Sequence, residues 1–365
     1  MKGNVLKKFL CTCLVTAAAF AATTISASAC TTIYVGGDLV EEGTPFVART
    51  EDYGSDYNKL WFISESGKWK QGDHYVGCPE YGPFEWDFTH DSYRFTYFTN
   101  DIYYDGICPE CGEKADHYSY TEFGTNEKGV SVSATETLYG NKKVTEADPY
   151  RDAEWAEANK SERIGIEETD IPTIILAEAS SAREGVKLLL DIYENYGCVA
   201  ASGVFVCDKD EVWYVENCSG TQYVAIKLND NMIFLEPNMA VIGRVDLDDE
   251  NVIASKDLIA VAKKAGTFVG DEAKNIIDFR ASYARISEKM DQRMIDGLNY
   301  LNVAYKYDSD ALVTDNTKFT ISNLDASDKL VALYTNIKAD RKLDKDDVFG
   351  YYKLSSIGKA SNQEI

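Results

Sequence analysis

The boundary between Ala29 and Cys30 constrains this 365-residue chain more than any other feature of its sequence. Residues 27–29 (ASA) have the small-residue pattern after which signal peptidases cut, and residues 30–36 (CTTIYVG) follow directly. The second run has the composition of a strand. We therefore expect the folded protein to begin at Cys30, and to begin with a strand.

The segment before this boundary has the parts of a secretory signal. Lys2, Lys7 and Lys8 give it a positive start, and residues 9–22 are mostly apolar but too short and too interrupted to cross a membrane. We predict that residues 1–29 are removed and that the protein is secreted or held at the cell surface. The alternative is a lipoprotein signal, in which Cys30 is acylated and serves only as an anchor. Lipoprotein signals favour Leu three residues before the cysteine, where this chain has Ala27. They are usually followed by a flexible tether, whereas the residues after Cys30 have the composition of a strand.

Cleavage before Cys30 would place a thiol and an α-amine on one residue. An unperturbed α-amine has a pKa near 8, so it is partly neutral at physiological pH and can accept the thiol proton. The two groups together form a nucleophile and its base. The sequence thus predicts that removal of the signal also activates an enzyme.

Composition and charge limit the remaining possibilities. With 45% hydrophobic and 12% aromatic residues, residues 30–365 can form one large α/β domain. The formal charge of −23 would become −26 after loss of the three signal lysines, which disfavours nucleic acid and anionic membranes as partners. No later stretch approaches the ~20 apolar residues of a membrane span.

The cysteines offer two interpretations. Six remain when the signal cysteines and Cys30 are set aside, enough for three disulfides in an exported protein. The alternative is a zinc site built on the Cys-x-x-Cys spacing of Cys108 and Cys111. His74, Cys78 and His117 are near enough in sequence to complete it. The cysteines expected to form disulfides are Cys78, Cys108, Cys111, Cys198, Cys207 and Cys218.

The order of predicted elements favours an α+β architecture. Residues 31–37 and 45–49 form a predicted hairpin, and residues 59–120 an excursion rich in aromatic residues and cysteines. That excursion is either a cross-linked structural loop or a wall of a substrate cleft. Strands grouped apart from helices indicate antiparallel sheets covered by helices. The further strands expected are 129–135, 203–207, 212–216, 223–228 and 232–235, and the helices are 186–196, preceded by a Ser181–Glu184 capping box, 255–265, 273–281, 288–301 and 327–337.

Several short motifs resemble one known family. The chain from Cys30 onward is similar to the secreted dipeptidase A-type cysteine peptidases, which belong to the N-terminal-nucleophile hydrolase superfamily together with bile salt hydrolases and penicillin V acylases. This resemblance implies a four-layer αββα sandwich of antiparallel sheets. It also implies a truncated C-terminus, because similar proteins continue beyond Ile365. The motifs are residues 30–33 (CTTI), 47–52 (VARTED), 126–130 (NEKGV), 134–137 (ATET), 238–239 (NM) and 246–249 (DLDD).

The resemblance assigns catalytic roles to five residues. It makes Cys30 the nucleophile and the α-amine of Cys30 the base. It places Arg49 and Asp52 as a pair beside these two groups. A guanidinium favours a thiolate and a carboxylate can orient an amine, although an Arg and an Asp three apart are otherwise an ordinary surface pair. Asn238 matches an amide that stabilises the oxyanion. Arg293 matches a second arginine, for which Arg280 and Arg285 are rivals.

The resemblance further implies that Asn126, Thr135 and Glu136 border a cleft for a dipeptide or short peptide. A turn at a sheet edge explains Asn126 equally well. Glu136 either accepts the substrate's α-ammonium or is structural. No metal or organic cofactor is implied, an acylase of a non-peptide amide is the alternative activity, and the sequence leaves open whether the chain forms a homo-oligomer.

Overall fold

The structure, a computed structural model, describes residues 30–50, 59–77, 84–100, 121–135, 138–285, 291–301, 305–306, 312–313, 334–335 and 342–354. Within these ranges the chain forms two main antiparallel sheets. The smaller has the strand order β19-β12-β1-β2 and the larger β14-β11-β10-β9-β8-β7-β6-β3. In chain order these strands are β1 (Thr31–Val35), β2 (Phe46–Thr50), β3 (Lys59–Ser64), β6 (Phe95–Asn100), β7 (Phe123–Asn126), β8 (Ser131–Thr135), β9 (Ser202–Cys207), β10 (Val212–Asn217), β11 (Tyr223–Lys227), β12 (Ile233–Pro237), β14 (Val252–Ala254) and β19 (Tyr334–Thr335).

The two sheets pack face to face through aromatic side chains. Phe234 of β12 lies 4.7 Å from Tyr214 of β10 and 5.7 Å from Phe205 of β9, measured between ring centroids. Tyr34 pairs with Phe234 across β1 and β12 and is fully buried in the same cluster. Large rings buried between two sheets supply much of the apolar area that holds such a sandwich together.

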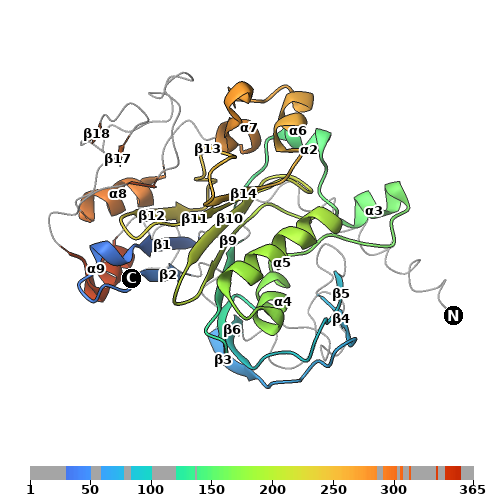
Figure 1. The fold of residues 1–365 in the computed structure, drawn as a ribbon, viewed down its shortest axis with the longest axis horizontal. Helices are drawn as coiled ribbons and strands as arrows, with labels where there is room; N and C mark the ends of the chain where they lie inside the picture. The colour runs from blue at the N-terminus through green and yellow to red at the C-terminus, as the bar shows by residue number, and fades with distance from the viewer. Residues whose placement is uncertain are drawn as a thin grey trace, which may run out of the picture.

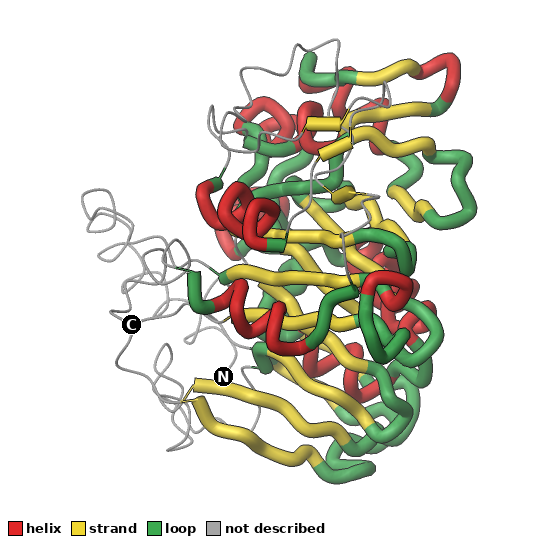
Figure 2. Tube along the Cα trace, turned by 90° about the vertical axis from the view of Figure 1, so that its left-hand side faces the viewer, coloured by secondary structure: helices red, strands yellow, loops and turns green. Residues whose placement is uncertain are grey.

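Helices cover the outer face of each sheet, which completes four layers. On the larger sheet, Val206 and Trp213 pack against α4 and α5, and on the smaller, Leu235 packs near Gly297 of α8 and Tyr351 of α9. Figure 1 shows the order of the layers, from α8 and α9 through the two sheets to α4 and α5. Figure 2, turned by 90°, shows the strands lying side by side along the length of the molecule. The predicted αββα arrangement is confirmed. The helices are α2 (Lys142–Ala147), α3 (Ala153–Asn159), α4 (Ile171–Glu178), α5 (Ala182–Asn195), α6 (Leu258–Ala265), α7 (Phe279–Tyr283), α8 (Gln292–Tyr300) and α9 (Lys345–Tyr352).

Smaller elements connect these layers. A three-stranded sheet, a hairpin and a short two-stranded sheet lie outside the main sheets, and two 3₁₀ turns follow β1 and β15. They are η2 (Gly37–Leu39), β4 (His74–Val76) with β5 (Glu85–Asp87), β13 (Arg244–Asp246) with β16 (Ile276–Asp278) and β15 (Gly270–Asp271), η4 (Glu272–Lys274), and β17 (Tyr305–Lys306) with β18 (Leu312–Val313).

Three expectations from the sequence require correction. The excursion at 59–120 is not a loop where it is described, because β3 and β6 extend the larger sheet to its edge. The helix expected at 273–281 is divided into η4, β16 and α7, since Asn275 adopts a left-handed φ of 53° and ends the 3₁₀ turn. Part of the helix expected at 327–337 is instead the strand β19, which pairs with β12.

The cysteine prediction is only partly within the described ranges. Cys207 and Cys218 carry thiols, so the bridges expected through them are absent from this structure. Cys207 lies opposite Val212, at the other end of the β9–β10 pair from Cys218, and two such positions cannot be bridged. Cys198 Sγ donates a hydrogen bond to the Ser219 carbonyl oxygen at 3.1 Å. Cys78, Cys108, Cys111 and His117, and with them most of the alternative zinc site, lie outside the described residues.

Candidate active site

Strand register brings Cys30 and Asn238 together. β1 lies between β12 and β2, with Thr31 opposite both Pro237 and Thr50. The residue before Thr31 therefore lies beside the residue after Pro237. Because side chains alternate along a strand, Cys30 shares the inner face of the sheet with Thr32, whose partner on β2 is Arg49. Cys30 is only 4% exposed.

The Arg49 guanidinium contacts the Cys30 thiol. Its Nη2 lies 3.6 Å from Cys30 Sγ, and its Nη1 donates to the Glu122 carbonyl oxygen at 3.1 Å and to Ser133 Oγ at 3.2 Å. Nη1 also donates to the carbonyl oxygen of Ala134 on β8. These acceptors hold the cation in place across the gap between the sheets. A fixed positive charge beside the sulfur favours the thiolate, which is the nucleophilic form.

The Glu168 carboxylate lies near the same guanidinium nitrogen of Arg49 that contacts the thiol. Its Oε1 is 3.8 Å from Arg49 Nη2, and its side chain is 13% exposed. Glu168 precedes α4 in the acidic run Glu167–Asp170, which the sequence analysis did not connect with the site. Acidic residues are common on surfaces, so this run gave no signal that it would reach a buried arginine.

Arg293 holds the other side of Cys30. Asp291 caps α8 and forms an ion pair with the Arg293 side chain at 2.8 Å, which orients the guanidinium. Arg293 Nη1 then donates to the Cys30 carbonyl oxygen at 3.1 Å, to Thr31 Oγ1 at 2.9 Å and to Asn238 Oδ1 at 2.7 Å. The guanidinium thus ties together the backbone and side chains of three residues around the thiol.

The rival arginines lie elsewhere. The Arg285 guanidinium stacks over the Tyr139 ring, 4.3 Å from its centroid. Arg280 is buried on α7, where its charge acts on the Glu216 carboxylate. Of the three arginines weighed from sequence, geometry therefore places Arg293 beside Cys30.

Asn238 has an unusual backbone conformation. Its φ of 44° lies in the left-handed region, which Asn tolerates better than most residues. Arginine can only donate, so its contact with Asn238 fixes the amide with Oδ1 toward Arg293 and Nδ2 directed away from it. An amide nitrogen held in this way can donate to an oxyanion.

Two hydroxyl groups secure the backbone of β1 next to the thiol. Thr50 Oγ1 accepts a hydrogen bond from Thr31 N at 3.2 Å, and Tyr352 of α9 donates its hydroxyl to the Thr31 carbonyl oxygen at 3.2 Å. Neither residue was identified from sequence, because a lone Tyr or Thr carries no spacing signal. They limit the freedom of the residue that follows Cys30.

The residues predicted to bind substrate occupy different places. Asn126 is buried in the β7–β8 turn, where its side chain accepts from Lys128 N and Val130 N and donates to the Leu176 and Ala179 carbonyl oxygens. It lies at the turn end of the hairpin, away from Ala134, and its contacts are those of the turn interpretation. Thr135 is buried at the end of β8 and donates to the Gly203 carbonyl oxygen. Asp52 and Glu136 lie outside the described residues.

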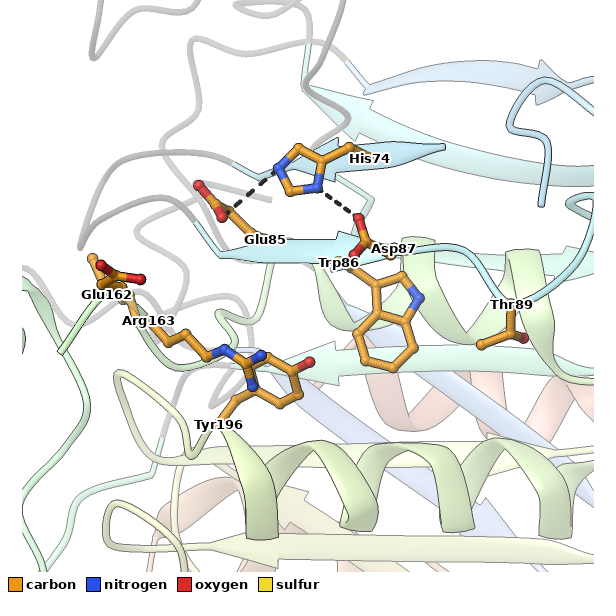
Figure 3. Close-up of a pocket in the computed structure, with 9 residues that line it drawn as sticks. His74, Glu85, Trp86, Asp87, Thr89, Glu162, Arg163 and Tyr196 are labelled. Atoms are coloured by element: carbon orange, nitrogen blue, oxygen red, sulfur yellow. Dashed lines mark hydrogen bonds and ion pairs between the residues drawn. The ribbon is translucent and has the colours of Figure 1, made fainter. Parts of the chain in front are cut away.

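A separate cavity of about 170 Å³ opens between the β4–β5 hairpin and the end of α5. Figure 3 shows His74 between the carboxylates of Glu85 and Asp87, and Arg163 against Tyr196. None of the residues that line this cavity contacts Cys30 in the hydrogen bonds and ion pairs described above. Within the described ranges, no cluster of His, Cys, Asp and Glu has the arrangement of a metal site, and no helix is both long and apolar enough to cross a bilayer.

Cys30 lies buried at the start of a strand of an αββα framework, with one arginine at its thiol and a second at its carbonyl oxygen. This arrangement defines the class of candidate cysteine hydrolases. The chain belongs to peptidase family C69, whose family model matches residues 29–329.

Curated relatives and one solved structure are similar to parts of this chain. The chain is 33% identical over 247 residues to "Probable dipeptidase B" of Streptococcus pyogenes serotype M6, covering 67% of this chain and 44% of that relative. It is 32% identical over 262 residues to "Probable dipeptidase" of Salmonella dublin, covering 70% and 53%. The chain thus spans about half the length of these relatives. Penicillin V acylase from Agrobacterium tumefaciens is similar at 14% identity and a TM-score of 0.32, over 57% of this chain and 49% of that one.

Proposed function

We propose that this protein is a cysteine dipeptidase whose nucleophile, Cys30, becomes N-terminal when residues 1–29 are removed during export. The observation that carries the proposal is the 3.6 Å contact between Arg49 Nη2 and Cys30 Sγ. The names of the curated relatives support a dipeptide as substrate.

The proposed reaction is acyl transfer in two steps. The α-amine of Cys30 takes the thiol proton, and the thiolate attacks the peptide carbonyl carbon, while Arg49 stabilises the sulfur charge. Asn238 Nδ2 donates to the oxyanion of the tetrahedral intermediate, and Arg293 keeps that amide oriented. The α-ammonium then protonates the leaving amine. Water hydrolyses the thioester and returns the thiol.

The proposal also assigns roles to Asp52 and Glu136, which remain predictions. A carboxylate at Asp52 would orient the α-amine, and one at Glu136 would accept the α-ammonium of the substrate. Acidity and the predicted signal favour a protein that works outside the cytoplasm. No group beyond the side chains, the α-amine and water is needed for these steps.

The decisive experiment combines intact mass with activity on the exported protein. We expect the mass of a chain that starts at Cys30 without an adduct, hydrolysis of dipeptides, and no hydrolysis by Cys30→Ala. A diacylglyceryl adduct on Cys30 would instead identify a lipid anchor. Faster cleavage of penicillin V or a conjugated bile salt than of any dipeptide would identify an acylase.

The precursor supplies a second arm of the experiment. In a form that retains even one residue before Cys30, the Cys30 nitrogen is part of a peptide bond and cannot act as a base. Such a form should bind a dipeptide but hydrolyse it slowly. Cys30→Ser should keep a small activity, since a hydroxyl is the weaker nucleophile. Equal turnover by the precursor and mature forms would contradict the proposed base.

A further inference from the structure

The Glu216 carboxylate lies between the two sheets with no exposed surface. It belongs to β10 of the larger sheet, on the same face as Tyr214, whose ring packs against Phe234 of the smaller sheet. Glu216 therefore points toward β12 and the segment that follows it. Charged side chains are almost never fully buried without specific partners.

Its partners are two consecutive backbone N–H groups. Val241 N donates to Glu216 Oε1 at 2.6 Å, and Ile242 N donates to Oε2 at 3.1 Å. Val241 and Ile242 are themselves fully buried. They follow Asn238 by three and four residues, so the carboxylate fixes the segment that carries the left-handed Asn238.

Only a carboxylate fits this pair of donors. A glutamine has one carbonyl oxygen and one NH₂ group, so one of the two N–H groups would face another donor. An apolar residue would leave both N–H groups buried without acceptors, at about 1–3 kcal/mol each.

Burial of the Glu216 carboxyl has a cost, which its hydrogen-bond donors offset. Burial raises the pKa of the Glu216 carboxyl to about 7, against the opposing effects of the two N–H donors, the Tyr214 hydroxyl and the Arg280 charge. Removal of the carboxylate alone would leave the Val241 and Ile242 N–H groups unpaired, so this side chain is coupled to the segment that carries them. The carboxylate therefore maintains the geometry of that segment.

We propose that Glu216 is a positioning residue for the active site, which holds Asn238 in its left-handed conformation by anchoring Val241 and Ile242. This inference rests on the proposed role of Asn238 as the oxyanion donor. Arg293 fixes the amide from one side and Glu216 fixes the backbone from the other. A displacement of about 1 Å in such a donor is enough to cost on the order of a hundredfold in rate.

The test is a double-mutant cycle of Glu216→Gln and Asn238→Ala, measured with a dipeptide substrate. We expect Glu216→Gln alone to lower kcat by roughly 10- to 100-fold with KM within about twofold, since the oxyanion forms only in the transition state. In the Asn238→Ala background, the same substitution should change kcat by less than about twofold. Equal effects in both backgrounds would overturn the proposal.

Glu178→Gln is the matched control. Glu178 is also a buried carboxylate, but it lies on α4 and accepts from Trp86 Nε1 and Thr89 N, remote from Cys30. It should affect stability yet leave kcat within about twofold in both backgrounds. If Glu216→Gln does not fold, Glu216→Asp keeps the charge but reaches fewer donors, and the same cycle applies to it.

Hydrogen exchange gives a readout that does not depend on activity. We expect the Val241 and Ile242 amides to lose protection in Glu216→Gln, while amides of β10 and β11 remain protected. Unchanged protection would overturn the proposal even if the protein does not hydrolyse dipeptides. Conversely, an active wild type that Cys30→Ala inactivates, with an additive cycle, would reject the role of Glu216 and leave the proposed function in place.

Discussion

Arg293 Nη1 donates to Asn238 Oδ1 at 2.7 Å, and the same nitrogen donates to the carbonyl oxygen of Cys30 at 3.1 Å. One guanidinium nitrogen thus sets the position of the Cys30 backbone relative to the amide proposed to bind the oxyanion. Asp291 holds that guanidinium through a second ion-paired nitrogen. The proposed catalytic geometry depends on the planar fork of an arginine.

Lysine should therefore fail as a replacement for Arg293. An ammonium cannot keep the Asp291 contact and all three contacts toward β1 and Asn238 at once. We expect Arg293→Lys to lower kcat by roughly 10- to 100-fold with a small change in KM. Steady-state kinetics with a dipeptide measure both. Arg285→Lys, at the exposed arginine over Tyr139, is the control and should retain wild-type kinetics.

Alkylation should distinguish Cys30 from the other described thiols. Burial, together with the Asp208 carboxylate, raises the pKa of the Cys207 thiol to about 11, so little thiolate is present there at pH 7. Arg49 favours the thiolate of Cys30. We expect iodoacetamide to modify Cys30 before Cys207, as followed by peptide mass mapping. Arg49→Gln should slow the Cys30 reaction at pH 7 and leave that of Cys207 unchanged; equal slowing at both sites contradicts this.

The stability of the fold should fall in acid partly through Glu211. Burial alone would raise its pKa, but hydrogen bonds from Arg183, Trp213 and Lys227 lower it to about 2. Because the folded pKa is lower than the unfolded one, the stabilisation is complete above about pH 5 and is lost as the pH falls toward 2. A shift of this size corresponds to at most about 3 kcal/mol, and solvent at the exposed Arg183 reduces the expected contribution to about 1–2 kcal/mol.

Glu211→Gln tests this contribution. We expect its free energy of unfolding to be lower than that of the wild type at pH 7 and the difference to shrink steadily toward pH 3, as measured by urea unfolding. Glu272→Gln removes an exposed ion pair with Lys263 and should cost less than about 0.5 kcal/mol at any pH. A difference for Glu211→Gln that is constant with pH would exclude titration of this carboxyl as its cause.

The proposed substrate has a free amino group next to the scissile bond. Desolvation of that cation requires a carboxylate partner, for which Glu136 remains the prediction. Acetylation of a good dipeptide should lower kcat/KM on the order of a hundredfold. Glu136→Gln should reduce this discrimination while hydrolysis of the acetylated substrate stays the same. Equal hydrolysis of free and acetylated dipeptides by the wild type would exclude recognition of the amino group.

The sequence predicted elements with strong local patterns. The helix preceded by Ser181 forms as α5, and Ser181 Oγ accepts from Glu184 N as expected, although the Glu184 carboxylate returns to Ser180 and not to Ser181. The strands 203–207 and 212–216 appear as β9 and β10. By contrast, α4 was not predicted. All eight of its residues are buried, so it lacks the polar face that gives an amphipathic helix its period.

The candidate site was predictable where one motif carried several residues. Cys30 was predicted from its position directly after the signal, and Arg49 from the resemblance of residues 47–52 to a known family. Glu168 reaches Arg49, and Glu216 reaches the segment after Asn238, only through the packing of the two sheets and the course of the loop after β12. Contacts of this kind depend on tertiary structure, which leaves no periodicity in the sequence.

The contact between Tyr352 and the Thr31 carbonyl oxygen joins residues 321 positions apart. A chain made from its N-terminus exposes Cys30 long before Arg293 and α9 have been synthesised. Until they arrive, β1 lacks the contacts that hold the thiol and its neighbouring carbonyl groups in register. The proposed nucleophile is thus among the first residues made and among the last to be placed, so a partly synthesised chain should carry the thiol without the proposed peptidase activity.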